Sequence, residues 1–194
     1  MEKYYAVRKG RKKGIYKTYS DCLIQVKGFP SAEFKSFSTK KEAEDYMNKK
    51  VTELNLSIPT VYCDGSYNIF TNEYSFGAIL LLNNKEFTFN RKFSKDEYSV
   101  YRNVAGEVRG AAYMINYCLK KGLKEINLCY DYAGIEKWFK GEWKANNNLT
   151  LNYQEFARKN KDKITVNFIK IKSHTNDKYN DIADRLAKDA LGIK

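Results

Sequence analysis

The chain has 194 residues, 43% of them hydrophobic and 15% aromatic, which is enough for a packed core in one large domain or an ordinary domain plus a small one. Its 35 lysines and arginines against 23 acidic residues give a net charge of +12, which favours nucleic acid as the partner. One histidine and four cysteines without zinc-type spacing exclude a Cys/His zinc site. The lack of a signal peptide or an apolar run of 18 residues predicts a cytoplasmic protein with reduced thiols and no membrane span.

The first fifty residues have the pattern of a small α+β domain. Strands are expected at residues 4–7, 14–18 and 32–37, and the first two are joined by a turn that is almost entirely basic. A short helix is predicted over residues 20–26, and Thr39 with Glu42 forms a capping box at the start of a second helix. Residues 1–50 carry 13 basic and 6 acidic side chains. This predicts a basic domain with a three-stranded sheet over residues 1–49. The alternative to a binding role is an ordinary small core with a solvated positive face.

Five segments of this region resemble the hybrid-binding module at the N-terminus of type 1 ribonucleases H and in the viroplasmin protein: residues 4–10, 18–22, 25–26, 29–32 and 34–37. The resemblance implies binding of an RNA·DNA hybrid and, as a second ligand, double-stranded RNA. Recognition would be by sugar and shape rather than by base sequence.

The resemblance also implies roles for single residues, which are aromatic packing on DNA by Tyr19 and Phe34, phosphate contacts by Tyr5 and Lys35, and backbone contacts to RNA 2′-hydroxyls at Gly28 and Ser31. Tyr19 stands where the family usually has Trp, and Ser36 where it often has a second Lys, so a weaker grip on the hybrid is expected.

A short linker is predicted over residues 50–58, and Pro59 opens the larger domain, residues 59–194. Residues 60–63 alternate in the manner of a buried strand, and Gly65-Ser66 is expected to break the pattern and leave Asp64 at the strand's end. A metal ligand and a residue that caps a turn are both open interpretations of Asp64 at this point.

Further carboxylates follow at the ends or borders of predicted elements. Strands at residues 74–82 and 86–93 around the Asn83-Asn84 turn predict an antiparallel meander. Asn103 is expected to cap a helix that runs to about residue 121, with Glu107 at the border of its apolar stripe. Two interpretations of Glu107 are open: its carboxylate faces the sheet, or it only interacts favourably with the dipole at the N-terminus of the helix. The next strand, residues 124–130, ends at Asp131. If it lies parallel to the Asp64 strand, both carboxylates emerge at one sheet edge.

The remaining elements bring one more carboxylate and the only histidine. Helices are predicted at residues 134–140 and 150–160, a polar loop at 141–149 and a strand at 163–171. His174 follows in a polar loop. On the final helix, residues 178–191, Asp184 borders the apolar stripe and Asp181 points away from it.

Four carboxylates, Asp64, Glu107, Asp131 and Asp184, thus converge, and divalent cations make such a cluster tolerable. Together with the segments 62–66, 102–107, 130–131, His174 and 180–187, the constellation resembles the ribonuclease H superfamily. The resemblance implies an α/β fold with a mixed five-stranded sheet flanked by helices. It also implies hydrolysis of the RNA strand of RNA·DNA hybrids to 5′-phosphate and 3′-hydroxyl ends, by two Mg²⁺ ions for which Mn²⁺ would substitute, in a monomer.

In that family Asp64 would bridge both ions, Asp184 would hold the water-activating ion, and Glu107 and Asp131 the leaving-group ion. His174 would move protons and help the product leave. Substrate contacts are implied for Asn103, Ser66 and Asn180.

The sequence departs from the family pattern at two places, and two alternative functions are considered. Tyr132 stands where many members have Ser, and the 141–149 loop is too short for the basic protrusion of some bacterial enzymes, which the N-terminal domain would replace. A viroplasmin-like binding protein with a vestigial nuclease site is one alternative, but all four carboxylates are present. A Mg²⁺-dependent phosphatase is another, but it would need no hybrid-binding module.

Overall fold

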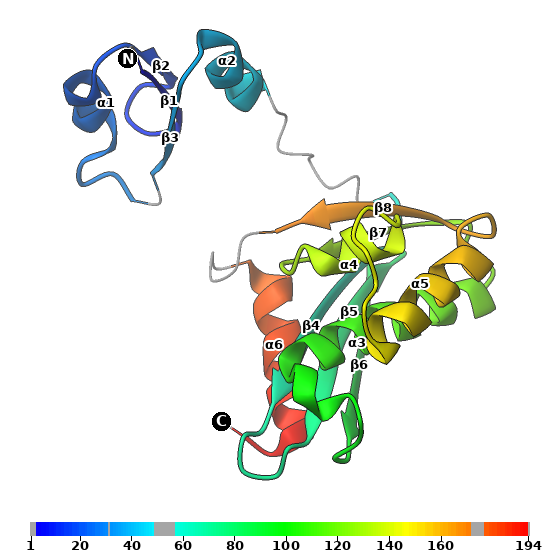
Figure 1. The fold of residues 1–194 in the computed structure, drawn as a ribbon. Coiled ribbons are helices and arrows are strands. Elements are labelled where there is room, and N and C mark those ends of the chain that lie inside the picture. Colours follow the sequence, from blue (N-terminus) through cyan, green and yellow to red (C-terminus); the bar gives the residue numbers. More distant parts are fainter. Residues whose placement is uncertain (1–2, 31, 49–56, 172–176, 194) are drawn as a thin grey trace. The chain divides into compact units, whose positions relative to one another are not determined.

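The computed structural model describes residues 3–30, 32–48, 57–171 and 177–193, and the chain divides into two compact units, Met1–Asn55 and Leu56–Lys194 (Figure 1). The predicted linker falls almost entirely outside the described residues. Within the described residues, no helix is long and apolar enough to cross a membrane.

The smaller unit is a three-stranded antiparallel sheet with one helix on each face. Its strands are β1 (Tyr4–Lys9), β2 (Gly14–Tyr16) and β3 (Glu33–Phe37), in the order β2-β1-β3, and its helices are α1 (Tyr19–Val26) and α2 (Lys40–Asn48). Val7, Cys22 and Val26 form the core beneath α1, and Ala43 of α2 is buried. The capping box is confirmed, because the Thr39 N–H donates to Glu42 and the Glu42 N–H donates to the Thr39 hydroxyl, at 3.1 and 3.2 Å.

The larger unit contains the predicted five-stranded mixed sheet, in the order β6-β5-β4-β7-β8. The strands are β4 (Thr60–Tyr67), β5 (Tyr74–Leu82), β6 (Lys85–Phe93), β7 (Glu125–Tyr130) and β8 (Thr165–Lys170). The first three form the predicted antiparallel meander, with Asn83 and Asn84 both at positive φ in its tight turn. β4, β7 and β8 run parallel, as expected when helices connect them.

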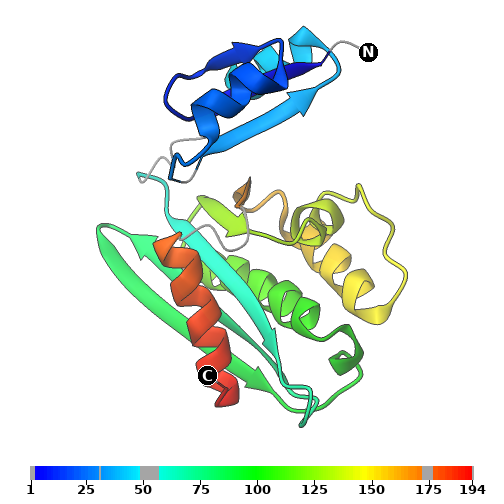
Figure 2. The ribbon, with the colours of Figure 1, turned by 90° about the vertical axis from the view of Figure 1, so that its left-hand side faces the viewer.

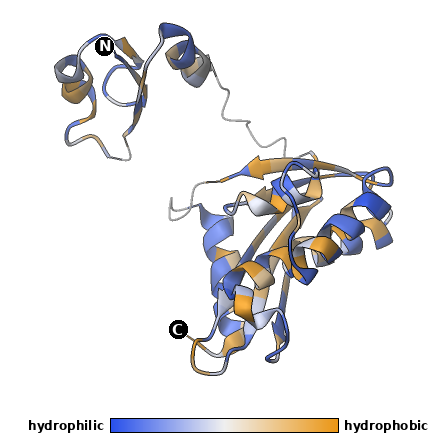
Figure 3. Ribbon diagram, viewed as in Figure 1, coloured by the Kyte–Doolittle hydropathy of each residue, from blue (hydrophilic) through white to orange (hydrophobic). Residues whose placement is uncertain are grey.

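Helices cover both faces of this sheet. They are α3 (Asn103–Lys120), α4 (Gly134–Phe139), α5 (Asn148–Asn160) and α6 (Lys178–Leu191), and a short 3-10 helix, η1 (Ser99–Tyr101), precedes α3. Figures 1 and 2 show α6 on one face of the sheet and α3 on the other, with α5 beside α3. In Figure 3, α3 and α5 carry both hydrophilic and hydrophobic residues, as amphipathic helices do.

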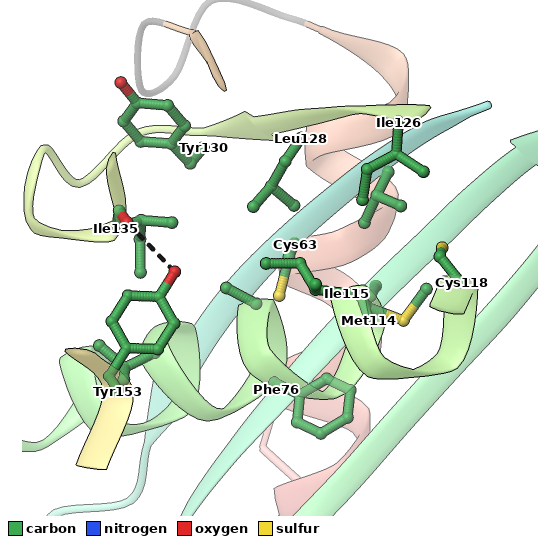
Figure 4. Close-up of a cluster of buried hydrophobic side chains, with 14 of the residues drawn as sticks. Cys63, Phe76, Met114, Ile115, Cys118, Ile126, Leu128, Tyr130, Ile135 and Tyr153 are labelled. Carbon is green, nitrogen blue, oxygen red and sulfur yellow. Dashed lines mark hydrogen bonds between the residues drawn. The ribbon is translucent and has the colours of Figure 1, made fainter. Parts of the chain in front are cut away.

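The main core lies between α3 and the sheet. Figure 4 shows Phe76 of β5, Met114 and Ile115 of α3, and Ile126 and Leu128 of β7 packed together there. All five side chains are at most 1% exposed, so the centre of the sheet and the first helix form one solid unit that holds the strand ends in place.

Two local predictions were wrong. β4 does not end at Asp64 but continues to Tyr67, because Gly65 and Ser66 pair with Phe76 and Ser75 of β5 instead of forming a turn. Asn103 is the first residue of α3 rather than its cap. Arg102, at φ 54°, occupies the cap position without a side-chain hydrogen bond to the helix.

Candidate metal centre

Three of the four predicted carboxylates lie together at one end of the parallel strands. Asp64 of β4, Glu107 of α3 and Asp131, which follows β7, each offer an oxygen atom, and these atoms all lie within 4.8 Å of one another. Pairing between β4 and β7 ends at Tyr62 and Cys129, two residues before each aspartate. The aspartates therefore stand where the ladder stops and the sheet opens, the position at which open α/β sheets keep their sites.

Glycines allow Glu107 to reach this point. A Cβ atom at Gly65 would overlap the backbone of Asn103 and Glu107, and one at Gly106 would overlap the backbone of Ser75. α3 therefore lies directly on β4 and β5 without intervening side chains. Glu107 is carried into the interior, with only 6% of its surface exposed. The sequence placed it at a stripe border in the first turn, whereas close packing buries it in the second.

Burial and mutual repulsion shape the electrostatics of the cluster. Burial first, and then the charges of Asp131 and Asp64, raise the pKa of Glu107 to about 8. Burial first, and then the Asp131 charge, raise the pKa of Asp64 to about 6, although the Gly65 N–H donates to Asp64 Oδ1 at 2.7 Å and opposes the shift. Asn103 Nδ2 donates to Glu107 Oε1 at 3.1 Å.

The chemistry of these donors fits a hard divalent cation. Three carboxylates with no neutral nitrogen or thiolate among the clustered ligands are the oxygen set that Mg²⁺ and Mn²⁺ prefer. A cation would also relieve the repulsion that raises both pKa values. We therefore identify Asp64, Glu107 and Asp131 as the residues that could hold a metal ion.

Asp184 of α6 approaches the site from the face of the sheet opposite α3 (Figures 1 and 2) and is not one of the three clustered carboxylates. A Cβ at Gly77 of β5 would overlap the backbone of Ala183 and Ala187, so α6 also packs closely on the sheet. Asp184 is near enough for its charge to raise the pKa of Asp64. Its Oδ2, however, accepts a hydrogen bond from Lys188 Nζ at 2.7 Å, an ion pair that the sequence analysis did not foresee. Asp181 is exposed, as predicted.

The predicted substrate residues of this unit differ in their accessibility. Asn103 is exposed at the start of α3, next to the carboxylates. Ser66 and Asn180 are each 8% exposed, and the Asn180 N–H is capped by Asp177 at the start of α6. His174 lies outside the described residues, so its role stays a prediction.

In the smaller unit, strand pairing brings some of the predicted binding residues to one face. Tyr5 pairs with Ser36, and Phe34 pairs with Val7, which puts Tyr5 and Phe34 on the face covered by α1. The Tyr5 and Tyr19 rings are 5.6 Å apart there, and Tyr19 and Phe34 are 52% and 42% exposed.

Two further predicted binding residues lie elsewhere on this unit. Lys35 lies on the other face of the sheet, 5.6 Å from the Phe37 ring. Gly28 has φ 70° at an exposed turn, and Ser31 lies outside the described residues.

An aromatic cluster beside the carboxylates was missed. Tyr132, Trp138 and Trp143 contact one another, with ring centroids 5.7 to 6.5 Å apart, and Trp143 is 41% exposed. The charge of Glu107 helps to raise the pKa of Tyr132, after burial, so this ring borders the metal centre. The only signal in the sequence was an aromatic residue directly after Asp131 and two tryptophans within the next twelve positions.

Comparison with known proteins gives two family matches. A family model described as RNase H matches residues 55–192, and one described as the ribonuclease H1 N-terminal domain matches residues 3–47. Human ribonuclease H1 is 45% identical over 49 residues, which are 25% of this chain and only 17% of the human protein. Ribonuclease H of Acetivibrio thermocellus is 29% identical over 145 residues, covering 68% of this chain and 93% of that protein.

Solved structures share the fold of the larger unit. RNase H1 of Halobacterium salinarum covers 69% of this chain and 97% of its own, with a TM-score of 0.58 and 19% identity. The structure of LC11-RNase H1, solved in complex with an RNA/DNA hybrid, matches 69% of this chain and 99% of its own, with a TM-score of 0.54 and 12% identity. Both likenesses confirm the predicted fold class.

The raised pKa of Glu107 predicts that the metal-free protein loses stability as the pH rises. Between the unfolded value of 4.5 and the folded value of about 8, the folded state holds a proton that the unfolded state has released. The free energy of unfolding therefore falls with pH in this window, by up to about 1.4 kcal/mol per pH unit for one proton, and levels off above it. Asp64 adds to the slope only up to about pH 6.

Glu107→Gln should flatten this dependence, because glutamine does not titrate. Thermal melts in EDTA from pH 5 to 9 check it, and added Mg²⁺ should raise the melting temperature of the wild type more at pH 8 than at pH 5. A variant and a wild type with parallel pH profiles would contradict the prediction.

Proposed function

The chain belongs to the ribonuclease H family, and from this premise we propose that it is an endoribonuclease that hydrolyses the RNA strand of RNA·DNA hybrids, leaving 5′-phosphate and 3′-hydroxyl ends. The observation that carries the proposal is the convergence of Asp64, Glu107 and Asp131 within 4.8 Å at the end of the parallel strands. A vestigial site would have no reason to retain a buried, repelling cluster of this kind, since it costs stability.

The chain's own residues bind and orient the reacting groups. Asp64, Glu107 and Asp131 would hold two divalent cations, Mg²⁺ by preference, with Asp184 completing the set from α6. Such cations, when bound, supply the Lewis acidity that activates a water molecule and stabilises the leaving 3′-oxygen. Asn103, which is exposed and hydrogen-bonded to Glu107, is proposed to contact the substrate, and Glu107 is proposed to sense a 2′-hydroxyl. His174 is proposed to exchange protons near the scissile phosphate.

Selectivity for a hybrid would come from contacts to both strands. The exposed Trp143 ring contacts Tyr132, the residue that follows Asp131, and Lys137, Lys140 and Lys144 are nearby in the sequence. Rings that pack on sugars and lysines that meet phosphates bind a duplex without reading bases. We propose that the DNA strand lies along this surface, and that the smaller unit binds a neighbouring stretch of the hybrid through Tyr5, Tyr19 and Phe34.

Asp64→Asn tests the catalytic proposal. It removes one negative ligand from the centre of the cluster without altering the smaller unit, so hybrid cleavage should fall below detection while hybrid binding stays within about threefold of wild type. The measurements are cleavage of a labelled hybrid with Mg²⁺ and fluorescence anisotropy in EDTA. Asp181→Asn, an exposed aspartate on α6, is the matched control and should keep full activity. Cleavage that survives in Asp64→Asn would rule out the assigned site.

The Lys188 ion pair predicts an effect on metal binding. Because the Lys188 ammonium group pairs with Asp184 Oδ2, a cation that takes Asp184 as a ligand must compete with that positive charge. Both partners are partly exposed, so the pair contributes at most about 1 kcal/mol, and Lys188→Met should lower the Mg²⁺ concentration for half-saturation about two- to fivefold. Calorimetric titration with Mg²⁺ measures this, with Lys188→Arg as the charge-preserving control. Weaker Mg²⁺ binding in Lys188→Met would refute it.

Replacing Tyr19 and Phe34 together by alanine tests the role of the smaller unit. Base-independent aromatic contacts are worth about 1 to 3 kcal/mol each, so KM for a long hybrid should rise at least tenfold while kcat stays near wild type. Steady-state kinetics at physiological salt give both constants. Ile24→Ala, at an exposed apolar position on α1, serves as the control. An unchanged KM would show that these rings do not hold the hybrid.

A further inference from the structure

An open groove lies on the side of α3 away from the carboxylates, between β6 and α5. It encloses about 430 Å³, within the range of sites for small molecules. The residues that line it include Arg91, Phe93, Arg109, Tyr113, Asn116 and Asn160. Arg109 follows Glu107 by two positions, which is about half a turn of the helix, and Asn116 lies about 13 Å from Glu107 along the helix axis. The groove is therefore separate from the metal centre.

The groove carries excess positive charge. The guanidinium carbons of Arg91 and Arg109 lie 5.3 and 3.8 Å from the centre of the Phe93 ring, so two like charges share one aromatic side chain. Arg109 is fixed by an ion pair with Asp96 at 3.1 Å and donates to the Tyr74 hydroxyl. Arg91 has no ion pair with any residue in the described part of the chain. None of the described residues that line the groove is acidic. An anion would complete this arrangement.

The same groove offers a ring and two amides. Tyr113 is 38% exposed, and its ring packs against the rings of Phe76 and Phe89, at centroid distances of 5.2 and 6.3 Å. A ring held in this way can stack on a flat ligand at little cost in conformational entropy. Asn116 is an exposed amide on the next turn of α3, and Asn160 donates to the Phe156 carbonyl, which leaves its own side-chain oxygen as an acceptor.

We propose that this groove binds a nucleoside phosphate. The phosphate pairs with Arg91 and Arg109, the base stacks on Tyr113, and the Asn116 amide meets the donor and acceptor groups of the base edge. The ligand is either a free nucleotide or one nucleotide of a single strand, since both present the same chemistry. Neither the carboxylate cluster nor the proposed hydrolysis is needed for this binding.

Calorimetric titration of the full-length chain in EDTA tests the site with three probes: AMP, a tetradeoxyadenylate without terminal phosphates, and inorganic phosphate. AMP or the tetranucleotide should bind, and Arg91→Gln should weaken that binding at least tenfold. Asn116→Asp, a change at an exposed helix position, should weaken it as well. Arg158→Gln is the matched control, because Arg158 is an exposed arginine on α5 that does not line the groove, and it should stay within twofold of wild type.

The arms of the experiment separate the outcomes. Tighter binding of AMP identifies a free nucleotide as the ligand, and tighter binding of the tetranucleotide that depends on Arg91 identifies a single strand. Inorganic phosphate bound as tightly as AMP, no binding of any probe, or an equal loss in Arg158→Gln overturns the proposal. Hybrid cleavage by Arg91→Gln should remain within about twofold of wild type, so a failure of this site is distinguishable from a failure of the proposed nuclease function.

Discussion

Repulsion among carboxylates is the interaction on which the rest of the larger unit depends. Three acidic oxygens within 4.8 Å, one of them on a nearly buried glutamate, are tolerable only with a bound proton or a cation. The raised pKa values of Asp64 and Glu107 express that constraint. A rigid scaffold must hold the groups together against it. The solid core between α3 and the sheet supplies this scaffold.

The scaffold holds the carboxylates close together through direct contact between helix and strand backbones. Gly65 and Gly106 let α3 lie directly on β4 and β5, and Gly77 does the same for α6 on the opposite face. Each contact sets the height of a helix above the sheet, and with it the depth at which Glu107 and Asp184 approach Asp64. A side chain at any of these positions would push a helix away and separate the ligands.

The basic character of the chain takes different forms in different places. The smaller unit combines the exposed aromatic side chains of Tyr19 and Phe34 with an almost entirely basic turn between β1 and β2, a composition suited to a duplex recognised by its shape. On the larger unit, two arginines share one aromatic ring in a groove of limited volume, an arrangement suited to one nucleoside phosphate. The difference lies in geometry, because the residue types are the same.

The sequence by itself determined the element order, the strands of both sheets and the four acidic positions, because hydrophobic period and strand-end polarity are local properties. That five of these strands form one mixed sheet was implied by the resemblance to the ribonuclease H superfamily and not by the period. It also determined that Asp184 rather than Asp181 borders the core side of α6. Only the tertiary structure decided that β4 continues past Asp64, since Gly65 and Ser66 are held by pairing with β5. The Asp184–Lys188 ion pair joins residues four apart on α6, so helical spacing alone could have indicated it. Only the tertiary structure decided the burial of Glu107, because that burial depends on how closely α3 approaches the sheet, and no local pattern encodes a distance between segments.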